Sequence, residues 1–251
     1  MKNLIFTKDK IHLFKEIDST NLYASKIIND NTVEGTIIWA LFQTQGKGQK
    51  DNLWESKDSN NLTFSVILKP KLIKPTNQFN LNMAVSLSMV DFLKSVIPIS
   101  TIKLKWPNDI YINKDKVAGI LIESQIMGNC IENSIIGIGL NVNQIVFSNN
   151  IPNPTSLKLI SSIDYNLEEL LYRFLPFIEQ RIQQLYNLEF NILKDDYLNN
   201  LLYFNERKEY CIKNQITNAI IVGISEFGKL KLKLESNSYI ECDLKEIKFM
   251  L

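Results

Sequence analysis

Two lysines, an amide and a carboxylate are crowded around a short turn between two apolar runs of this chain. Lys105-Trp106-Pro107-Asn108-Asp109-Ile110 ends one run, and Lys116-Val117-Ala118-Gly119-Ile120-Leu121-Ile122-Glu123 forms the next. Pro107 ends the first run because proline cannot donate to a β-ladder. Residues 113–115 (Asn-Lys-Asp) are typical of a hairpin turn. Polar groups bunched between two strands indicate a site rather than a core, and ammonium groups suit anions.

A second segment with chemical groups follows an apolar run. It reads Gln43-Thr44-Gln45-Gly46-Lys47-Gly48-Gln49-Lys50-Asp51-Asn52-Leu53-Trp54. Glycine lets backbone N–H groups approach an anion closely, and a lysine between two glycines adds a positive charge. The spacing matches neither the phosphate-binding P-loop nor the G-x-G-x-x-G dinucleotide motif. The residues alone therefore favour an anion clamp and a solvated loop about equally.

Two further segments are weaker signals. Asp18-Ser19-Thr20-Asn21 has the residue types of a helix N-cap. Gly137-Ile138-Gly139-Leu140-Asn141-Val142-Asn143 ends an apolar run with glycine and asparagine, which can present amides to a nucleotide. Neither segment identifies a function by itself.

The elements that must position these segments are mostly strands. Apolar runs predict strands at residues 12–17, 35–43, 62–68, 102–105, 110–112, 117–122 and 131–140. Helical patterns predict helices from residue 18 to about 29 and at residues 76–96, 167–188 and 191–205. From about residue 208 the pattern changes to short strands at 210–213, 219–224, 230–234 and 239–242. We therefore expect an α+β domain at residues 1–206 and a small β domain at residues 207–251.

Composition limits the classes of protein that this chain can be. It has 251 residues, 28 Lys plus Arg and 27 Asp plus Glu, and a net charge of +1, unlike a dedicated nucleic-acid binder. Three scattered cysteines fit a reducing compartment, and the single histidine, His12, excludes a His-rich metal site. No run approaches the ~18–20 apolar residues of a membrane span, and the N-terminus lacks the apolar core of a signal peptide. We therefore expect a soluble cytoplasmic protein.

Taken together, the four segments resemble the biotin protein ligases. The strongest part of the resemblance is K-W-P-N-D-I together with K-x-x-G-I-L-x-E. The glycine-containing loop closed by Trp54 and the tetrad at residues 18–21 also match. The last match is G-x-G-x-N followed by Pro154-Thr155-Ser156-Leu157, so that the resemblance extends over about residues 12–157. It implies a mixed β-sheet flanked by helices, of the class II synthetase type, and a C-terminal SH3-like β-barrel. It also implies a monofunctional ligase, since the tetrad lies too near the start for a DNA-binding domain to precede it.

The resemblance also implies site residues. Lys116 and Lys47 would be catalytic, and Asp109 would help to hold Mg²⁺ with the nucleotide. Hydroxyls and amides suit the cyclic urea of biotin. The implied biotin-binding residues are Ser19, Thr20, Asn21, Gln43, Gly46, Lys47, Gly48, Gln49, Lys116 and Gly119. The implied ATP-binding residues are Lys50, Trp54, Lys105, Asn108 and Asn141. Trp39 and Leu121 are candidates for the walls of a hydrocarbon pocket and equally for the core.

The loop departs from the family pattern G-R-G-R-R-G at its basic positions. Lys47, Gln49 and Lys50 stand where the family has arginines, and Asp51 replaces the last glycine. Lysine lacks the bidentate fork of arginine, and glutamine carries no charge. We therefore expect a weaker grip on phosphate unless other groups compensate.

The implied activity has two steps and uses biotin, ATP and Mg²⁺. The biotin carboxylate attacks the α-phosphate of ATP to give biotinyl-5′-AMP and pyrophosphate, and a specific lysine of a biotin carboxyl carrier protein then attacks the anhydride. Family members pair through the sheet, so a homodimer is one expected assembly, whereas binding to DNA or membranes is not expected. A lipoate-type ligase of the same fold is the alternative, and a carrier-binding adaptor with a decayed site is a second one.

Overall fold

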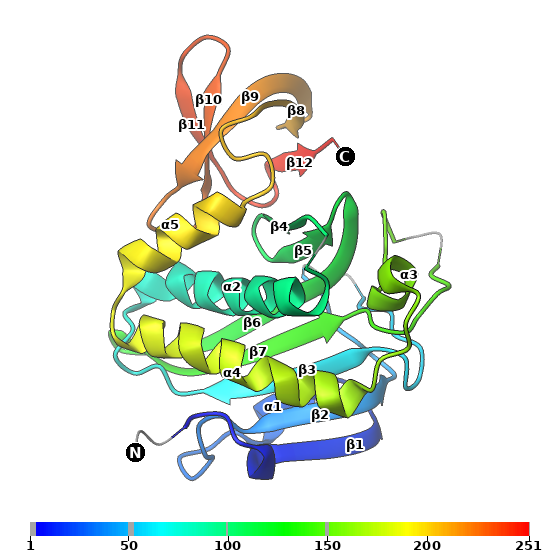
Figure 1. The fold of residues 1–251 in the computed structure, drawn as a ribbon. Coiled ribbons are helices and arrows are strands. Elements are labelled where there is room, and N and C mark those ends of the chain that lie inside the picture. Colours follow the sequence, from blue (N-terminus) through cyan, green and yellow to red (C-terminus); the bar gives the residue numbers. More distant parts are fainter. Residues whose placement is uncertain (1–3, 50–52, 99, 149–150, 251) are drawn as a thin grey trace.

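A seven-stranded mixed sheet forms the centre of the computed structural model, which describes residues 4–49, 53–98, 100–148 and 151–250. The strand order is β1-β2-β3-β7-β6-β5-β4 (Figure 1). β1 pairs with β2 in parallel, and the other neighbouring strands are antiparallel. The strands are β1 (Ile11–Ile17), β2 (Ile37–Gln43), β3 (Leu62–Leu68), β4 (Ile102–Lys105), β5 (Asp109–Ile112), β6 (Asp115–Met127) and β7 (Cys130–Leu140).

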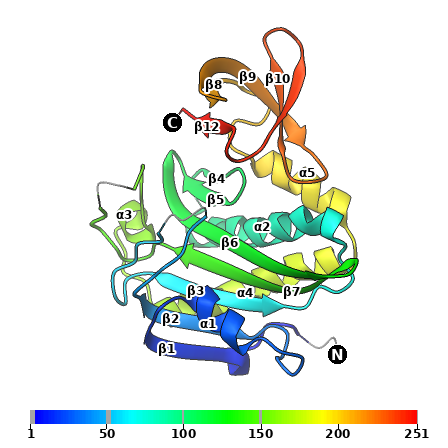
Figure 2. The same cartoon turned by 180° about the vertical axis from the view of Figure 1, so that it is seen from behind.

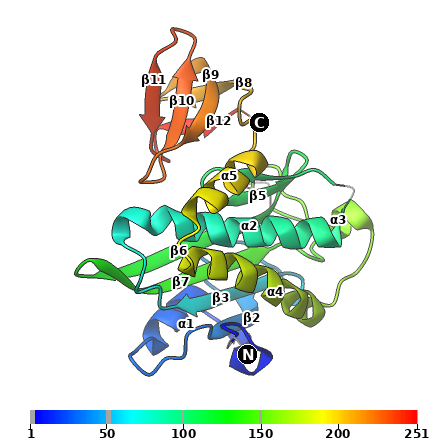
Figure 3. The same cartoon turned by 60° about the vertical axis from the view of Figure 1, so that its left-hand side comes forward.

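Two long helices cover one face of this sheet and build the main core. α2 (Gln78–Val96) and α4 (Leu167–Tyr186) pack side by side there, and α5 (Phe190–Asn200) lies next to α2 (Figures 1 and 3). The buried side chains of α4 recur three and four residues apart, so they share one side of the helix. β3 is buried along its whole length, as expected for a strand covered on both faces.

The opposite face is only partly covered, by α1 (Thr20–Ile27) (Figure 2). Ala24 of α1 packs there against Ile38, Ile67 and Ile135 in a small second core. Beyond α1, strands β6 and β7 carry glycines at positions 119, 137 and 139 instead of bulky side chains. This bare, glycine-containing part of the face leaves room for groups from other segments, and Asn21 and Trp54 lie against its glycines.

The C-terminal strands form a second, antiparallel sheet in the order β11-β10-β9-β8-β12. They are β8 (Arg207–Ile212), β9 (Gln215–Ile224), β10 (Leu230–Leu234), β11 (Tyr239–Cys242) and β12 (Ile247–Phe249). The predicted barrel is wrong in one respect, because the sheet is open. Its edge strands β11 and β12, of four and three residues, do not pair with each other.

Two polar contacts attach the C-terminal region to the turn between β4 and β5. Trp106 Nε1 donates to the carbonyl oxygen of Gly228 at 2.9 Å, and the Tyr197 hydroxyl donates to the carbonyl oxygen of Pro107 at 3.0 Å. Gly228 has a φ of +82°, and a Cβ there would lie 2.3 Å from the ring of Phe79. Glycine at this position therefore permits the close approach that the Trp106 bond requires.

The predicted strands and helices are present with shifted ends, and four further elements are present. α3 (Leu157–Ser161), β12 (Ile247–Phe249) and two 3₁₀ turns, Lys8–Lys10 and Pro75–Asn77, were not predicted. Ser156 explains α3, since its hydroxyl caps the helix by accepting from the amide of Leu159. Ser19 occupies the N-cap of α1, but its side chain makes no capping hydrogen bond. Among the described residues, no helix is both long and apolar enough to span a membrane.

Candidate active site

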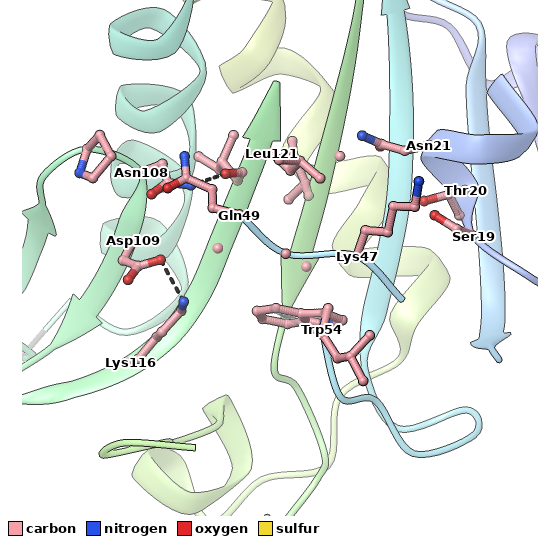
Figure 4. A pocket seen from close by; sticks show the side chains of 18 of the residues that line it. Ser19, Thr20, Asn21, Lys47, Gln49, Trp54, Asn108, Asp109, Lys116 and Leu121 are labelled. Atoms are coloured by element: carbon pink, nitrogen blue, oxygen red, sulfur yellow. Dashed lines mark hydrogen bonds and ion pairs between the residues drawn. The ribbon is translucent and has the colours of Figure 1, made fainter. Parts of the chain in front are cut away.

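A cavity of about 330 Å³ opens on the bare part of the sheet, beside the segment that follows β2 (Figure 4). A hollow of about 820 Å³ adjoins it, and both are lined by Trp54, Lys105, Asp109 and Lys116. Nine of the ten predicted biotin-binding residues line the first cavity: Ser19, Thr20, Asn21, Gln43, Lys47, Gly48, Gln49, Lys116 and Gly119. The tenth, Gly46, lines the second. The fold thus gathers side chains from widely separated segments around one space.

A carboxylate between two ammonium groups marks the boundary of the two cavities. Lys116 Nζ lies 2.6 Å from Asp109 Oδ1, and Lys105 Nζ lies 4.0 Å from Asp109 Oδ2. Burial lowers the pKa of Lys105; Asp109 opposes this shift, and the ammonium of Lys116 adds to it. Lys105 also lies 5.4 Å from the ring centroids of both Tyr111 and Phe249, the latter from β12. The C-terminal sheet therefore contributes directly to the surroundings of this cation.

Hydroxyl and amide groups line the end of the first cavity next to α1. The backbone N–H and the hydroxyl of Thr20 both donate to Gln43 Oε1, at 2.7 and 3.1 Å. Asn21 Nδ2 donates to Glu123 Oε2 at 2.6 Å, and the buried Ser65 hydroxyl contacts both Thr20 and Asn21. This end of the cavity therefore presents both donors and acceptors to a ligand.

Trp54 lies where the two cavities meet. A Cβ at position 139 would lie 2.3 Å from its indole, and one at position 119 would lie 3.2 Å from it, so both glycines are needed for the ring to rest on the sheet. Lys116 Nζ is 5.9 Å from the ring centroid. The indole N–H is buried without a hydrogen-bond partner among the described residues. A ligand acceptor at the junction would satisfy it.

Two other predicted ATP-binding residues, Asn108 and Asn141, are buried and bonded to backbone carbonyls. Asn108 is buried and its Nδ2 donates to the carbonyl oxygen of Ile120. Asn141 is also buried and donates to the carbonyl oxygen of Thr155 at 2.9 Å. Both amides therefore hold neighbouring segments in place, although Asn108 lines the first cavity and Asn141 the second. Lys50 and Asp51 lie outside the described residues.

Asp109 is the one acidic side chain beside Lys105 and Lys116 that could bind a metal ion, among the residues that line the two cavities. Within the described ranges, no group of three His, Cys, Asp or Glu side chains is arranged to hold a metal ion. Asp109 and Glu55 are the carboxylates that line the two cavities, and Glu55 accepts from Gln144 and from the amide of Ser148. Mg²⁺ commonly uses one or two carboxylates together with substrate phosphates. Asp109 therefore suits Mg²⁺ that arrives with a nucleotide, better than Mg²⁺ bound alone.

Several contributors were not predicted from the sequence. Ser65 and Gln144 are fully or almost fully buried polar residues. The one signal in the sequence is the place of Ser65 inside the apolar run at residues 62–68. Gln144 accepts from Asn61 Nδ2 at 2.6 Å and from the amide of Lys57, which ties the segment after Trp54 to the end of β7. Leu121 lines the first cavity, whereas Trp39 belongs to the main core.

Comparison with known proteins agrees with this geometry. The chain belongs to the biotin/lipoate A/B protein ligase family, whose model matches residues 13–141. The bifunctional ligase/repressor BirA of Bacillus subtilis is 40% identical over 129 residues, which are 51% of this chain and 39% of that protein. The biotin–[acetyl-CoA-carboxylase] ligase of Paracoccus denitrificans is 31% identical over 128 residues, 50% of this chain and 51% of that protein. The matches thus span about two fifths to one half of these relatives.

A solved structure is similar along nearly the whole chain. It is the biotin protein ligase from Aquifex aeolicus in complex with biotin and ATP, with a TM-score of 0.79 and 29% identity. The similarity covers 95% of this chain and 97% of that one. The predicted fold class, a mixed sheet flanked by helices with a C-terminal β-sheet, is therefore confirmed.

Proposed function

We propose that this protein activates biotin with ATP and transfers it to a lysine of a biotin carboxyl carrier protein. The observation that carries the proposal is the meeting of two cavities at Lys116, Asp109 and Trp54. One ends in hydroxyl and amide groups that suit the urea of biotin, and the other is the space for the nucleotide. The solved relative from Aquifex aeolicus was obtained with both of these ligands, which supports the assignment.

In the first step, a biotin carboxylate oxygen bonds to the α-phosphorus of ATP while pyrophosphate leaves. The two anions repel each other, so cations must neutralise them. Lys116 lies at the junction, and substrate oxygens would compete with Asp109 for its ammonium group. Lys47 lines the same cavity (Figure 4). Fixed charges in a site that excludes water can each contribute a few kcal/mol to such a step, and holding the reactants together contributes further.

In the second step, the amine of the acceptor lysine bonds to the anhydride carbonyl and AMP leaves. The anhydride must be kept from water until then. Trp54 rests on Gly119 and Gly139 at the junction of the two cavities, so its ring would form an apolar wall beside the anhydride. We propose a carboxyl carrier protein as the acceptor, in line with the name of the Paracoccus relative. A homodimer through the sheet belongs to the same proposal.

We further propose that Mg²⁺ enters with ATP and takes Asp109 as its protein ligand. The ion would neutralise phosphate charge, which adds to the contribution of the lysines. Binding of Mg²⁺ to Asp109 would release Lys116 to the substrate anions. In calorimetry, Mg²⁺ should therefore bind the complex of the protein with ATP more tightly than it binds ATP alone, and should not bind the protein without ATP.

Pyrophosphate release with biotin or lipoate as the acid substrate tests the proposed function. The protein is mixed with ATP, Mg²⁺ and one of the two acids, and biotinyl-5′-AMP is identified by mass spectrometry. We expect release with biotin and little with lipoate, since the dithiolane ring of lipoate has no hydrogen-bonding group for Thr20 and Asn21. Preference for lipoate would support the alternative, and tight binding of biotin without turnover of ATP would support the adaptor.

A further inference from the structure

We propose that Glu123 is a positioning residue that sets the direction of the hydrogen bonds at the α1 end of the first cavity, and thereby selects a head group that carries an N–H. The proposal rests on the proposed activation of biotin. Glu123 lines neither cavity and is exposed on β6, so it would act only through Asn21.

Five side chains form one continuous series of contacts there. Glu123 Oε2 accepts from Asn21 Nδ2 at 2.6 Å. Ser65 Oγ lies 2.6 Å from Asn21 Oδ1 and 2.6 Å from Thr20 Oγ1. The series ends at Gln43 Oε1, 3.1 Å from the Thr20 hydroxyl. Ser65 is 0% exposed, so these two neighbours are the partners of its hydroxyl.

The carboxylate fixes which way the Asn21 amide faces. A carboxylate accepts hydrogen bonds and donates none, so the NH₂ group of Asn21 must face Glu123 and the oxygen must face Ser65. Gly137 permits this placement, because a Cβ there would lie 2.4 Å from Asn21 Oδ1. If the Asn21 amide were turned over, its oxygen would lie about as close to the Glu123 carboxylate as its nitrogen does now, 2.6 Å. The two oxygens would repel each other.

This orientation leaves the series one proton short. Asn21 and Gln43 both present oxygens to it, and the hydroxyls of Ser65 and Thr20 supply two protons for three contacts. Among the described residues, none donates a further hydrogen bond to these side-chain oxygens except the amide of Thr20 to Gln43. One contact therefore brings two oxygens together without a proton between them, which makes this cluster of oxygens electronegative, and a ligand N–H directed at it would stabilise it.

The chemistry of the matching ligand follows from this count. A ligand N–H directed at the oxygens of Thr20 or Asn21 would stabilise this cluster. A cyclic urea carries two N–H groups, whereas a dithiolane carries none. If residue 123 were an amide, Asn21 could turn over and donate to Ser65. Ser65 would then donate to Thr20 and Thr20 to Gln43, which satisfies all three contacts without a ligand.

The test is the Glu123→Gln variant, with Glu16→Gln as the matched control. Glu16 is an exposed glutamate on β1 of the same sheet. In steady-state pyrophosphate release, we expect Glu123→Gln to raise the KM for biotin about tenfold, the effect of one hydrogen bond, with kcat and the KM for ATP within about twofold. The control should match the parent protein. An unchanged KM for biotin, or a fall in kcat alone, would overturn the proposal.

A second variant separates this route from a general disturbance of the fold. In the Ser65→Ala variant, the hydroxyl that contacts the Asn21 amide is absent. Turning the amide over then changes no hydrogen bond to residue 65, so adding Glu123→Gln should change the KM for biotin less than about twofold. Additive effects of the two substitutions would contradict the proposal. If the parent protein releases no pyrophosphate with biotin, the proposed function fails. If it does and Glu123→Gln behaves like the parent, only the present inference fails.

Discussion

The ammonium of Lys116 lies 2.6 Å from Asp109, and a substrate anion must compete with this carboxylate for it. The backbone of Lys116 is fixed as well, since its N–H donates to the carbonyl of Asn153 at 2.6 Å and its carbonyl accepts from Thr155 at 2.9 Å. The segment that resembles a further ligase motif, around Pro154, therefore holds the strand from which the lysine projects.

Replacing Lys116 tests this arrangement most directly. We expect Lys116→Ala to lower formation of biotinyl-5′-AMP by at least ~100-fold, because a charge-stabilising donor is lost. Lys114→Ala, an exposed lysine in the turn before β6, is the control. Biotin-dependent exchange of pyrophosphate into ATP is the measurement. Exchange close to that of the control would show that Lys116 is not part of the catalytic machinery.

Gln49 stands where the family pattern has arginine. Since it lines the first cavity, an arginine there would add a positive charge facing the substrates. We expect Gln49→Arg to be tolerated or mildly activating in the same exchange reaction. A large loss of activity would mean that this loop grips its ligands differently from the family.

Lys105 is partly buried, and burial disfavours the charged form of its ammonium group. Burial lowers its pKa, so the folded protein binds its proton less tightly than the unfolded chain does. This lowered pKa destabilises the folded protein, and the full destabilisation is present at every pH below the pKa of Lys105 in the folded state. The destabilisation decreases as the pH rises from that pKa toward 10.5, the ordinary pKa of lysine. We therefore expect Lys105→Met to raise the melting temperature at pH 7, and the gain to shrink toward pH 10. A gain independent of pH would point to packing instead.

β6 and β7 provide the floor on which Trp54 rests. Gly119 and Gly139 face each other in this pair of strands, and the indole lies against both. We expect Gly139→Ala to displace the ring and weaken ATP binding at least ~10-fold, measured by calorimetry, because its Cβ would lie 2.3 Å from the indole.

Gly223→Ala is the control for this substitution. Gly223 lies in β9, and no atom lies within 4 Å of a Cβ built there. ATP binding by this control should equal that of the parent. Unchanged binding by Gly139→Ala would show that Trp54 does not contact the nucleotide.

The two sheets meet at the turn that carries Asn108 and Asp109. Trp106 Nε1 bonds to Gly228 in the β9–β10 turn, and Leu244, in the turn between β11 and β12, lines the first cavity. Tyr197 of α5 bonds to Pro107 of the β4–β5 turn. The C-terminal sheet therefore supports the site from outside the central sheet.

Trp106→Phe tests this support. The smaller phenyl ring leaves some space, the bond to Gly228 is lost and a buried carbonyl is left without its partner. We expect the free energy of unfolding in urea to fall by at least about 1–2 kcal/mol. Hydrogen exchange should rise in β9 and β10 before it rises in the central sheet. Equal protection in both sheets would show that Trp106 does not couple them.

Much of the fold could be predicted because its signals are local. The runs that became β2, β3 and β7 are apolar and β-branched, and the buried positions of α4 follow helical spacing. The arrangement of the C-terminal strands was harder to predict from the sequence. The alternation of β8 to β10 predicted strands, but alternation does not say whether the last strands close into a barrel. Closure depends on pairing between β11 and β12, the two ends of the strand order, which have only four and three residues and do not pair.

The sequence by itself determined which groups are available: the lysines and the acid around Trp106-Pro107, the glycines of β6 and β7, and the polar tetrad before α1. Only the tertiary structure decided which of them meet. Ser65 reaches Asn21 across 44 residues and Glu123 reaches it across 102. Local propensity and spacing act over a few residues, whereas these contacts depend on the order of the strands and on the packing of α1 against them.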